Sequence, residues 1–237
     1  MPDIVDLPPN LRVSDRSDPQ LIANTRSGGM AINGFEQIIS PLSQRWIWRA
    51  TIPIHKKDQA RSLRVVLAKL QGRFGYLRAR VCDMYRVSRN EMGAIPVPGG
   101  KVPHSDGALF SDGSGYRPAG GTTNPVAGAL AGTSTLVLDT DIPLVVGTFF
   151  SSNSWLYVIT DIDDPVDLDN PGTERTVHIA PPLRSTISTD DEINFDAECL
   201  WQLAADDVGK LDLRLGKWGT VNLELVEPIG RADLYAT

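Results

Sequence analysis

Hydrophobic and polar positions alternate most clearly over residues 44–54, QRWIWRATIPI. On an extended chain one face carries Trp46, Trp48, Ala50, Ile52 and Ile54, and the other carries Arg45, Ile47, Arg49 and Thr51. A period of two in residue types that favour strands predicts a β-strand. We expect its tryptophan face to lie in the core and its arginine face to meet water or acidic groups. A ligand platform built from the two tryptophans is the alternative.

A helical period follows directly along the chain. The residues that recur at helical spacing are Ala60, Leu63, Leu67 and Leu70, with Val66 on the same side. This spacing predicts an amphipathic helix over 58–70, with Asp58 as its N-cap and Gly72 as the glycine that ends it. A strand is predicted next, over 74–83, so that strand, helix and strand form one compact unit.

The second half of the chain has a different pattern of residues. Residues 93–132 are rich in Gly and Pro and show no periodicity, which predicts a long loop without a phosphate-binding motif. Over 133–195 short apolar runs are separated by turn signals at intervals of roughly 8 to 12 residues, a pattern typical of a small β-barrel or sandwich. Three further strands are predicted within 197–227.

The N-terminal segment 1–33 contains the turn-rich stretches DLPPN, SDRSDP and TRSGG. Its prolines and glycines predict an extended arm rather than a folded unit. Such an arm is either a loose terminus or a segment that becomes ordered against a neighbouring subunit.

Composition narrows the classes of function. The 237-residue chain has a net charge of −6 and no block of five Lys or Arg residues, so general affinity for nucleic-acid phosphates is not expected. A local group of cations is interpreted as a solvated helix face: Arg61, Arg64, Lys69, Arg73, Arg78 and Arg80. Since no apolar run approaches about 18 residues, no membrane insertion is expected.

Candidate chemistry is sparse. None of His55, His104 and His178 has a second His or Cys at metal-ligand spacing. The carboxylate-rich stretch 160–174 fails as a calcium loop, because Pro171 and His178 would occupy positions that need oxygen ligands. Neither a nucleophile motif nor a pair of catalytic carboxylates stands out. We therefore expect no enzyme activity, no metal and no cofactor.

Aromatic residues in the second half allow one binding hypothesis. Trp155, Tyr157 and Phe149 could form a surface that binds saccharide. The opposing interpretation, which the alternation of the stretches FF and WLY favours, places these rings in the core of the barrel.

Taken in order, these motifs resemble those of structural tail proteins of long-tailed, siphovirus-like bacteriophages, of the distal tail type. The stretches that carry the resemblance are RWIWRATIPI, LAKLQGRFGYLRARVCD, PHSDGALFSDGSGY, GTFFSSNSWLYVITDI, HIAPPLRSTISTDDEINFD and CLWQLAADDVGKLDLRLGKWGTVNLELVE. Together they cover roughly residues 30 to 230. Each motif is weak alone, and their order and spacing give the resemblance its weight.

The resemblance implies a mainly β architecture. Residues 34–92 and 197–237 would form a discontinuous ring domain, a tail-tube-like β-sandwich with one packed helix whose core includes Trp46, Trp48, Leu63, Leu67 and Leu70. Residues 133–196 would form an inserted β-barrel of the OB type, with 93–132 as the lead-in. The two ends of an insertion lie together, so Cys82 and Cys199 are expected to be close, as reduced thiols.

The resemblance also implies a function without catalysis. The chain would form a homo-hexameric ring in the virion, assembled in the host cytoplasm, that joins the tail tube protein to the hub or tip proteins. DNA would pass through the ring without specific binding, and the acidic balance would suit such a lumen. Other tail stations (tube, terminator or hub subunit) are the alternatives, together with a barrel that binds saccharide.

Overall fold

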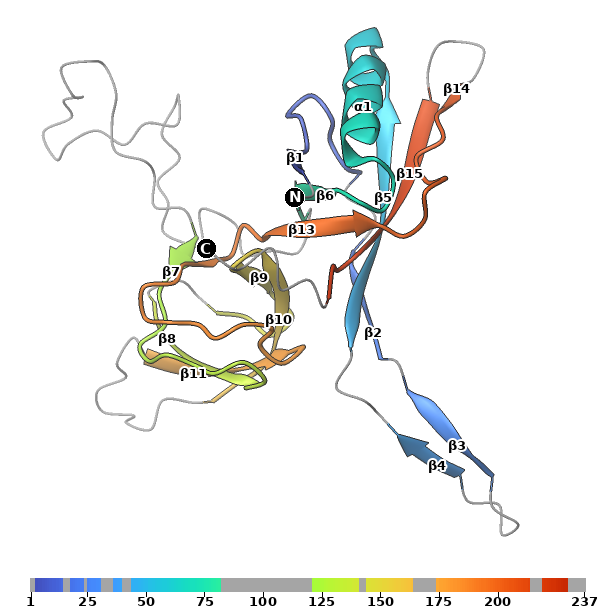
Figure 1. Ribbon diagram of the computed structural model, residues 1–237. Coiled ribbons are helices and arrows are strands. Elements are labelled where there is room, and N and C mark those ends of the chain that lie inside the picture. Colours follow the sequence, from blue (N-terminus) through green and yellow to red (C-terminus); the bar gives the residue numbers. More distant parts are fainter. Residues whose placement is uncertain are drawn as a thin grey trace, which may run out of the picture. The chain divides into compact units, whose positions relative to one another are not determined.

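The computed structural model describes residues 3–14, 18–23, 25–30, 36–39, 44–81, 121–140, 144–163, 174–213 and 219–229. The chain folds into two compact units (Figure 1). The first unit combines Met1–Met84 with Glu198–Thr237, and the second is Tyr85–Ala197. The described chain is mainly β, and its one helix, α1 (Lys57–Leu70), belongs to the first unit.

A seven-stranded sheet forms the first unit. Its order is β1 (Ile4–Asp6), β6 (Tyr76–Arg80), β13 (Glu198–Leu203), β15 (Gly219–Val226), β5 (Arg45–Ile54) and β2 (Gln20–Ile22), with β14 (Asp212–Leu213) also paired to β15. β1 is parallel to β6, and the other pairs are antiparallel. β13 changes partner midway: Glu198–Trp201 pair with β6, whereas Gln202 and Leu203 pair with β15.

The predicted strand over 44–54 is β5, and its alternation survives folding. Trp46, Trp48, Ala50, Ile52 and Ile54 are buried, while the residues between them are half-buried or exposed. The Trp48 ring meets that of Trp201 on β13, with centroids 5.2 Å apart. The inward row of β5 therefore lies in the core and offers no ligand platform.

Helix α1 covers the inward face of this sheet, alongside β5 and β15 (Figure 1). It begins at Lys57, so the prediction of Asp58 as N-cap was wrong. The side chain of Gln59 reaches back instead and accepts the backbone N–H groups of His55 and Lys56, at 2.8 and 3.0 Å. Asp58 lies in the first turn, where a negative charge suits the helix dipole. Leu63, Val66 and Leu70 are buried.

The N-terminal segment is not an arm separate from the sheet, which corrects the prediction for 1–33. β1 pairs with β6 and β2 pairs with β5, and Val5, Leu11 and Val13 are buried. The prolines and glycines of this segment gave no strand pattern, because β1 and β2 are short and pair with strands that lie further along the sequence. Among the described strands, β3 (Arg26–Met30) and β4 (Glu36–Ile39) form a separate two-stranded sheet.

The second unit contains a six-stranded sheet. Its order is β7 (Thr122–Thr123), β12 (Ile193–Asn194), β9 (Phe149–Ser152), β10 (Trp155–Ile162), β11 (Glu174–Ala180) and β8 (Thr135–Asp139). The two ends of this order are joined, because the Val126 N–H, just after β7, donates to the Val137 carbonyl of β8 at 2.9 Å. An isolated bridge between Pro125 and Leu138 supports the same contact.

A buried and an exposed residue of α1 provide a matched test of its packing against the sheet. Leu63 is 1% exposed and Val65, two residues later on the same helix, is 54% exposed. Because Leu63→Ala leaves a cavity, we expect it to lower the free energy of unfolding by about 2–5 kcal/mol. Val65→Ala should change that quantity by no more than about 0.5 kcal/mol. Urea titration of both variants measures the difference, and equal losses would contradict the packing described for α1.

Candidate functional site

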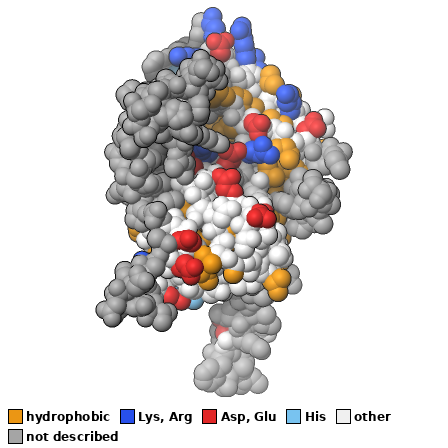
Figure 2. Space-filling model, turned by 90° about the vertical axis from the view of Figure 1, so that its left-hand side faces the viewer, with side chains coloured by type: hydrophobic (Ala, Val, Ile, Leu, Met, Phe, Trp, Pro, Cys, Tyr) orange, Lys and Arg blue, Asp and Glu red, His pale blue; other side chains and the backbone are white. Residues whose placement is uncertain are grey.

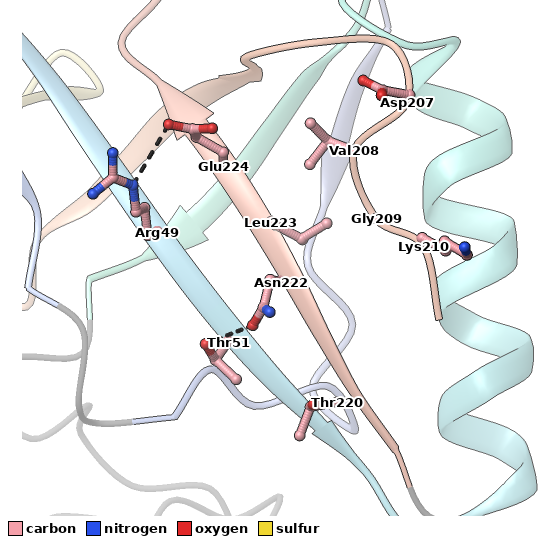
Figure 3. Close-up of a pocket in the computed structure, with 10 residues that line it drawn as sticks. All are labelled: Arg49, Thr51, Asp207, Val208, Gly209, Lys210, Thr220, Asn222, Leu223 and Glu224. Carbon is pink, nitrogen blue, oxygen red and sulfur yellow. Dashed lines mark hydrogen bonds and ion pairs between the residues drawn. The ribbon is translucent and has the colours of Figure 1, made fainter. Parts of the chain in front are cut away.

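The outward face of β5 and β15 carries a row of polar side chains. Thr51 of β5 lies directly opposite Asn222 of β15. The Thr51 carbonyl points away from β15, because it accepts the backbone N–H of Ser14 on the other side of β5. Thr51 and Asn222 are therefore a cross-strand pair that is not joined by backbone hydrogen bonds. Side chains approach most closely at such pairs. The Thr51 hydroxyl donates to Asn222 Oδ1 at 3.0 Å, and Arg49 Nε lies 3.6 Å from Glu224 Oε1 (Figure 3).

A pocket of about 640 Å³ opens beside this row. Its lining consists of Arg49, Thr51, Asp207, Val208, Gly209, Lys210, Thr220, Asn222, Leu223 and Glu224. The pocket exists because the chain leaves β15 for a short distance. Ala204 N–H donates to Glu224 C=O at 2.9 Å, and strand pairing resumes only where Asp212 faces Thr220. Between these points the segment 207–210 passes between β15 and α1 (Figure 3).

Two contacts hold this loop in place. Asp206 Oδ1 accepts the backbone N–H of Arg73, just beyond α1, at 2.9 Å. Gly209 has a φ of +97°, and a Cβ built there would lie 2.8 Å from a methyl carbon of Leu67 and 3.2 Å from one of Leu223. Only a glycine both adopts this backbone conformation without strain and fits between the two leucines. The loop is thereby tied to the helix rather than to the strand edge.

The chemistry of the pocket is that of a polar contact surface. It offers two cations, Arg49 and Lys210, two carboxylates, Asp207 and Glu224, and the hydroxyl and amide groups of the strands. Small-ligand pockets of similar volume are lined mainly by apolar and aromatic side chains. Here Val208 and Leu223 are the only large apolar members of the lining. The arrangement is suited to hydrogen bonds and ion pairs with a polar surface.

A buried carboxylate lies just beyond β15. Glu227, 3% exposed, accepts the backbone N–H of Trp46 through Oε2 at 3.1 Å, and its own N–H donates to the Trp46 carbonyl at 2.9 Å. Arg45 Nε donates to the Glu227 carbonyl at 2.8 Å. Burial lowers the pKa of Arg45, and the nearby Glu227 carboxylate opposes that shift. Glu227 thus joins the start of β5 to the end of β15.

The structure places the residues expected in the ring-domain core as follows. Trp46, Trp48, Leu63 and Leu70 are buried in the first unit, and Leu67 is half-buried against the loop at Gly209. Cys199 is a buried free thiol whose pKa is raised, first by burial and then by the nearby Glu227 and Glu198. Cys82 lies outside the described residues, so its distance from Cys199 remains a prediction.

The aromatic residues considered for saccharide binding lie inside the second unit. Tyr157 is fully buried and stacks on Phe150 with centroids 5.4 Å apart, while its hydroxyl accepts the Arg184 N–H at 3.0 Å. Trp155 is buried as well, and Phe149 is half-buried. The hypothesis of a saccharide-binding surface at Trp155 and Tyr157 is therefore wrong, because both side chains are buried.

The histidines take part in no metal centre among the described residues, where no suitable group of three or more His, Cys, Asp and Glu side chains occurs. His178 Nε2 lies 3.1 Å from Asp163 Oδ1, at the edge of the carboxylate-rich stretch. His55 is exposed, and His104 lies outside the described part of the chain. As for membranes, α1 is too short and too polar to cross a bilayer, and it is the sole helix in the described ranges.

A scan against protein-family models found no match, and a search of curated proteins found no significant relative.

The fit of Gly209 predicts a position-specific loss of stability. Gly209→Ala and Gly132→Ala both place a side chain at positive φ, but nothing lies within 4 Å of a Cβ at Gly132. Backbone strain should cost each variant about 1–2 kcal/mol. Because Gly209→Ala also displaces Leu67, we expect a further loss of about 1–3 kcal/mol for it alone. Chemical denaturation tests this difference, and equal losses would contradict the close packing of the loop.

Substitution of the two glutamates near the end of β15 is expected to lower stability by different amounts. Glu227→Ala leaves the buried N–H of Trp46 without its acceptor, so we expect it to lower the free energy of unfolding by about 1–3 kcal/mol. Glu224→Ala removes only an exposed ion pair, and we expect a loss below about 1 kcal/mol. Urea titration compares the variants, and a larger loss for Glu224→Ala would refute the role assigned to Glu227.

Proposed function

We propose that this protein is a non-enzymatic structural component of a long-tailed bacteriophage tail, of the distal tail type. In this proposal six copies form a ring in the virion that joins the tail tube to the tip. The motifs quoted in the sequence analysis suggest the class. The domain organisation of the chain is the structural observation that supports it best.

That organisation is a helix-backed sheet interrupted by a second β unit. Strand β6 ends at Arg80 and β13 begins at Glu198, and these two residues are direct partners in the sheet. The chain therefore leaves the first unit and returns to it at neighbouring points, after an excursion of more than a hundred residues. This is the layout expected for a ring domain that carries an inserted domain as a side decoration.

The finer architecture belongs to the same proposal. We interpret the first unit as a β-sandwich with one packed helix, because β13 passes from β6 to β15 midway and brings Trp201 against Trp48. We interpret the second unit as a small barrel of the OB type. The hydrogen bond between Val126 and Val137, which links the two ends of its strand order, supports a closed barrel.

Two features of the first unit favour assembly with other copies. The β3–β4 hairpin pairs with no other described strand, and an isolated two-stranded hairpin is only marginally stable in water. The outer edge of β5 is paired with β2 only at Arg45–Ile47, beyond which Ser14 supplies one more hydrogen bond. A neighbouring copy would stabilise the hairpin and pair with the open edge.

The location of the charges revises one expectation about the lumen. The first unit contains 17 Lys and Arg against 14 Asp and Glu, a net charge of +3, whereas the second contains 6 against 15, a net of −9. The acidic excess of the chain thus belongs to the inserted unit. If the first unit surrounds the passage for DNA, overall acidity does not explain why DNA slides through it.

The proposal predicts the state of the purified chain. We expect native mass spectrometry to give a hexamer at high protein concentration, and negative-stain imaging to show a six-fold ring with a central hole. Circular dichroism at the same concentrations serves as the control for folding. A folded chain that stays monomeric at every concentration would contradict a self-assembling ring, and another closed symmetry would favour a different tail station.

A further inference from the structure

The exposed side of α1 is basic, although the protein as a whole is acidic. Lys57, Arg61 and Arg64 follow one another at helical spacing and are exposed, and Lys69 and Arg73 extend the charge towards and beyond the end of the helix. Figure 2 shows Lys and Arg side chains gathered at the end of the molecule that α1 occupies in Figure 1. Asp58, which lies 3.5 Å from Arg61, is the one acidic residue of the helix. These five cations are called the basic face below.

Exposed apolar side chains accompany the basic face. Val65 is 54% exposed and Phe74, just after the helix, is 52% exposed. Exposed apolar side chains among arginines are characteristic of protein interfaces, whereas a surface that binds nucleic acid by its phosphates needs only the cations. The composition of this face therefore favours a protein partner.

The second unit has a surface of the opposite sign at one end of its sheet. Asp139 of β8 and Glu174 of β11 are direct cross-strand partners, and both are exposed. Two carboxylates at directly opposite positions give this end of the sheet a negative charge. Asp161 and Asp163, at the end of the neighbouring β10, are exposed as well. These four carboxylates are called the acidic end.

Among the described residues, Arg175 and His178 lie beside the acidic end. Arg175 donates to the Glu174 carbonyl and is half-buried, and His178 lies 3.1 Å from Asp163. Exposed apolar residues border this surface too. Val145 and Val146 precede Gly147, whose N–H donates to the Ile159 carbonyl, two residues before Asp161. The acidic end thus has the same composition as the basic face, with the opposite charge.

We propose that the basic face of α1 binds the acidic end of the second unit of another copy of this chain. The inference rests on the proposed ring and names the contact that closes it. Two different surfaces meet in such a contact, which makes it heterologous, and heterologous contacts form rings when the rotation closes. Opposite charges, with exposed apolar side chains beside them, select the partner and orient it.

Charge reversal on each surface tests the contact in the full-length chain. One variant carries Arg61→Glu with Arg64→Glu, and another carries Asp139→Lys with Glu174→Lys. We expect each to weaken self-association by at least about tenfold at low salt, measured by sedimentation velocity, and the effect to shrink as salt rises. A control with Arg12→Glu and Arg80→Glu makes the same change of net charge on exposed cations elsewhere in the first unit.

Mixing the two reversal variants separates this contact from all others. In a 1:1 mixture the two introduced glutamates on α1 of one variant face the two introduced lysines of the other, and the unaltered surfaces meet at the alternate contacts, so we expect assembly to recover. A contact made between the units of a single copy would not recover on mixing. Circular dichroism of each variant confirms that it is folded.

Each remaining result has a defined meaning. A wild-type ring that neither reversal weakens would overturn this contact and leave the proposed ring intact. A wild-type chain that never self-associates would overturn both. If reversal on α1 leaves assembly unchanged but abolishes binding of a labelled 20-base-pair DNA duplex, the basic face is a nucleic-acid surface instead. If the Arg12→Glu and Arg80→Glu control loses as much self-association as the α1 variant, the loss is due to net charge and the proposed contact is overturned.

Discussion

The first unit depends on the burial of one alternating row of side chains. The inward residues of β5 meet α1 on one side of the strand and, through Trp48, contact Trp201 of β13. β13 pairs with β6 at its start and with β15 at its end, so it belongs to both parts of the sheet. The contact between Trp48 and Trp201 therefore fastens β5 to the strand that links these two parts. The apolar surface buried by two tryptophans supplies several kcal/mol at a single point, on the order of 3 for each ring. The N-terminal strands β1 and β2 pair with β6 and β5 of this sheet, and Glu227 binds the backbone of Trp46 in β5.

The same core determines where polar groups are left for contacts. α1 takes the inward face, so the outward row from Arg49 to Glu224 stays accessible, and the loop at Gly209 is drawn towards Leu67 instead of pairing with β15. The polar pocket is therefore a consequence of how the helix packs. A surface of this composition suits contact with another polar surface, which agrees with a structural role in an assembly.

Charge is divided between the two units more unevenly than the overall value of −6 suggests. The helix-backed unit is weakly basic and the inserted unit strongly acidic. Within one chain such a division has little effect on stability when the charges are exposed, because solvent and salt screen them. Between chains it orients encounters and disfavours wrong pairings, which is what assembly into the proposed ring would require.

The sequence by itself determined the elements whose pattern is local. The period of two over 44–54, the helical period over 58–70 and the run of short strands after 133 all recur in the structure, because burial of one face leaves a regular signature. Tertiary structure alone decided the rest. β1 and β2 are three residues long and gain stability from β6 and β5 far along the chain, and the cap of α1 came from Gln59. The pocket at Gly209 likewise arises from contacts between residues 67, 209 and 223. Pairing between distant segments depends on which surfaces remain to be covered once the local elements exist, and no single window of sequence contains that information.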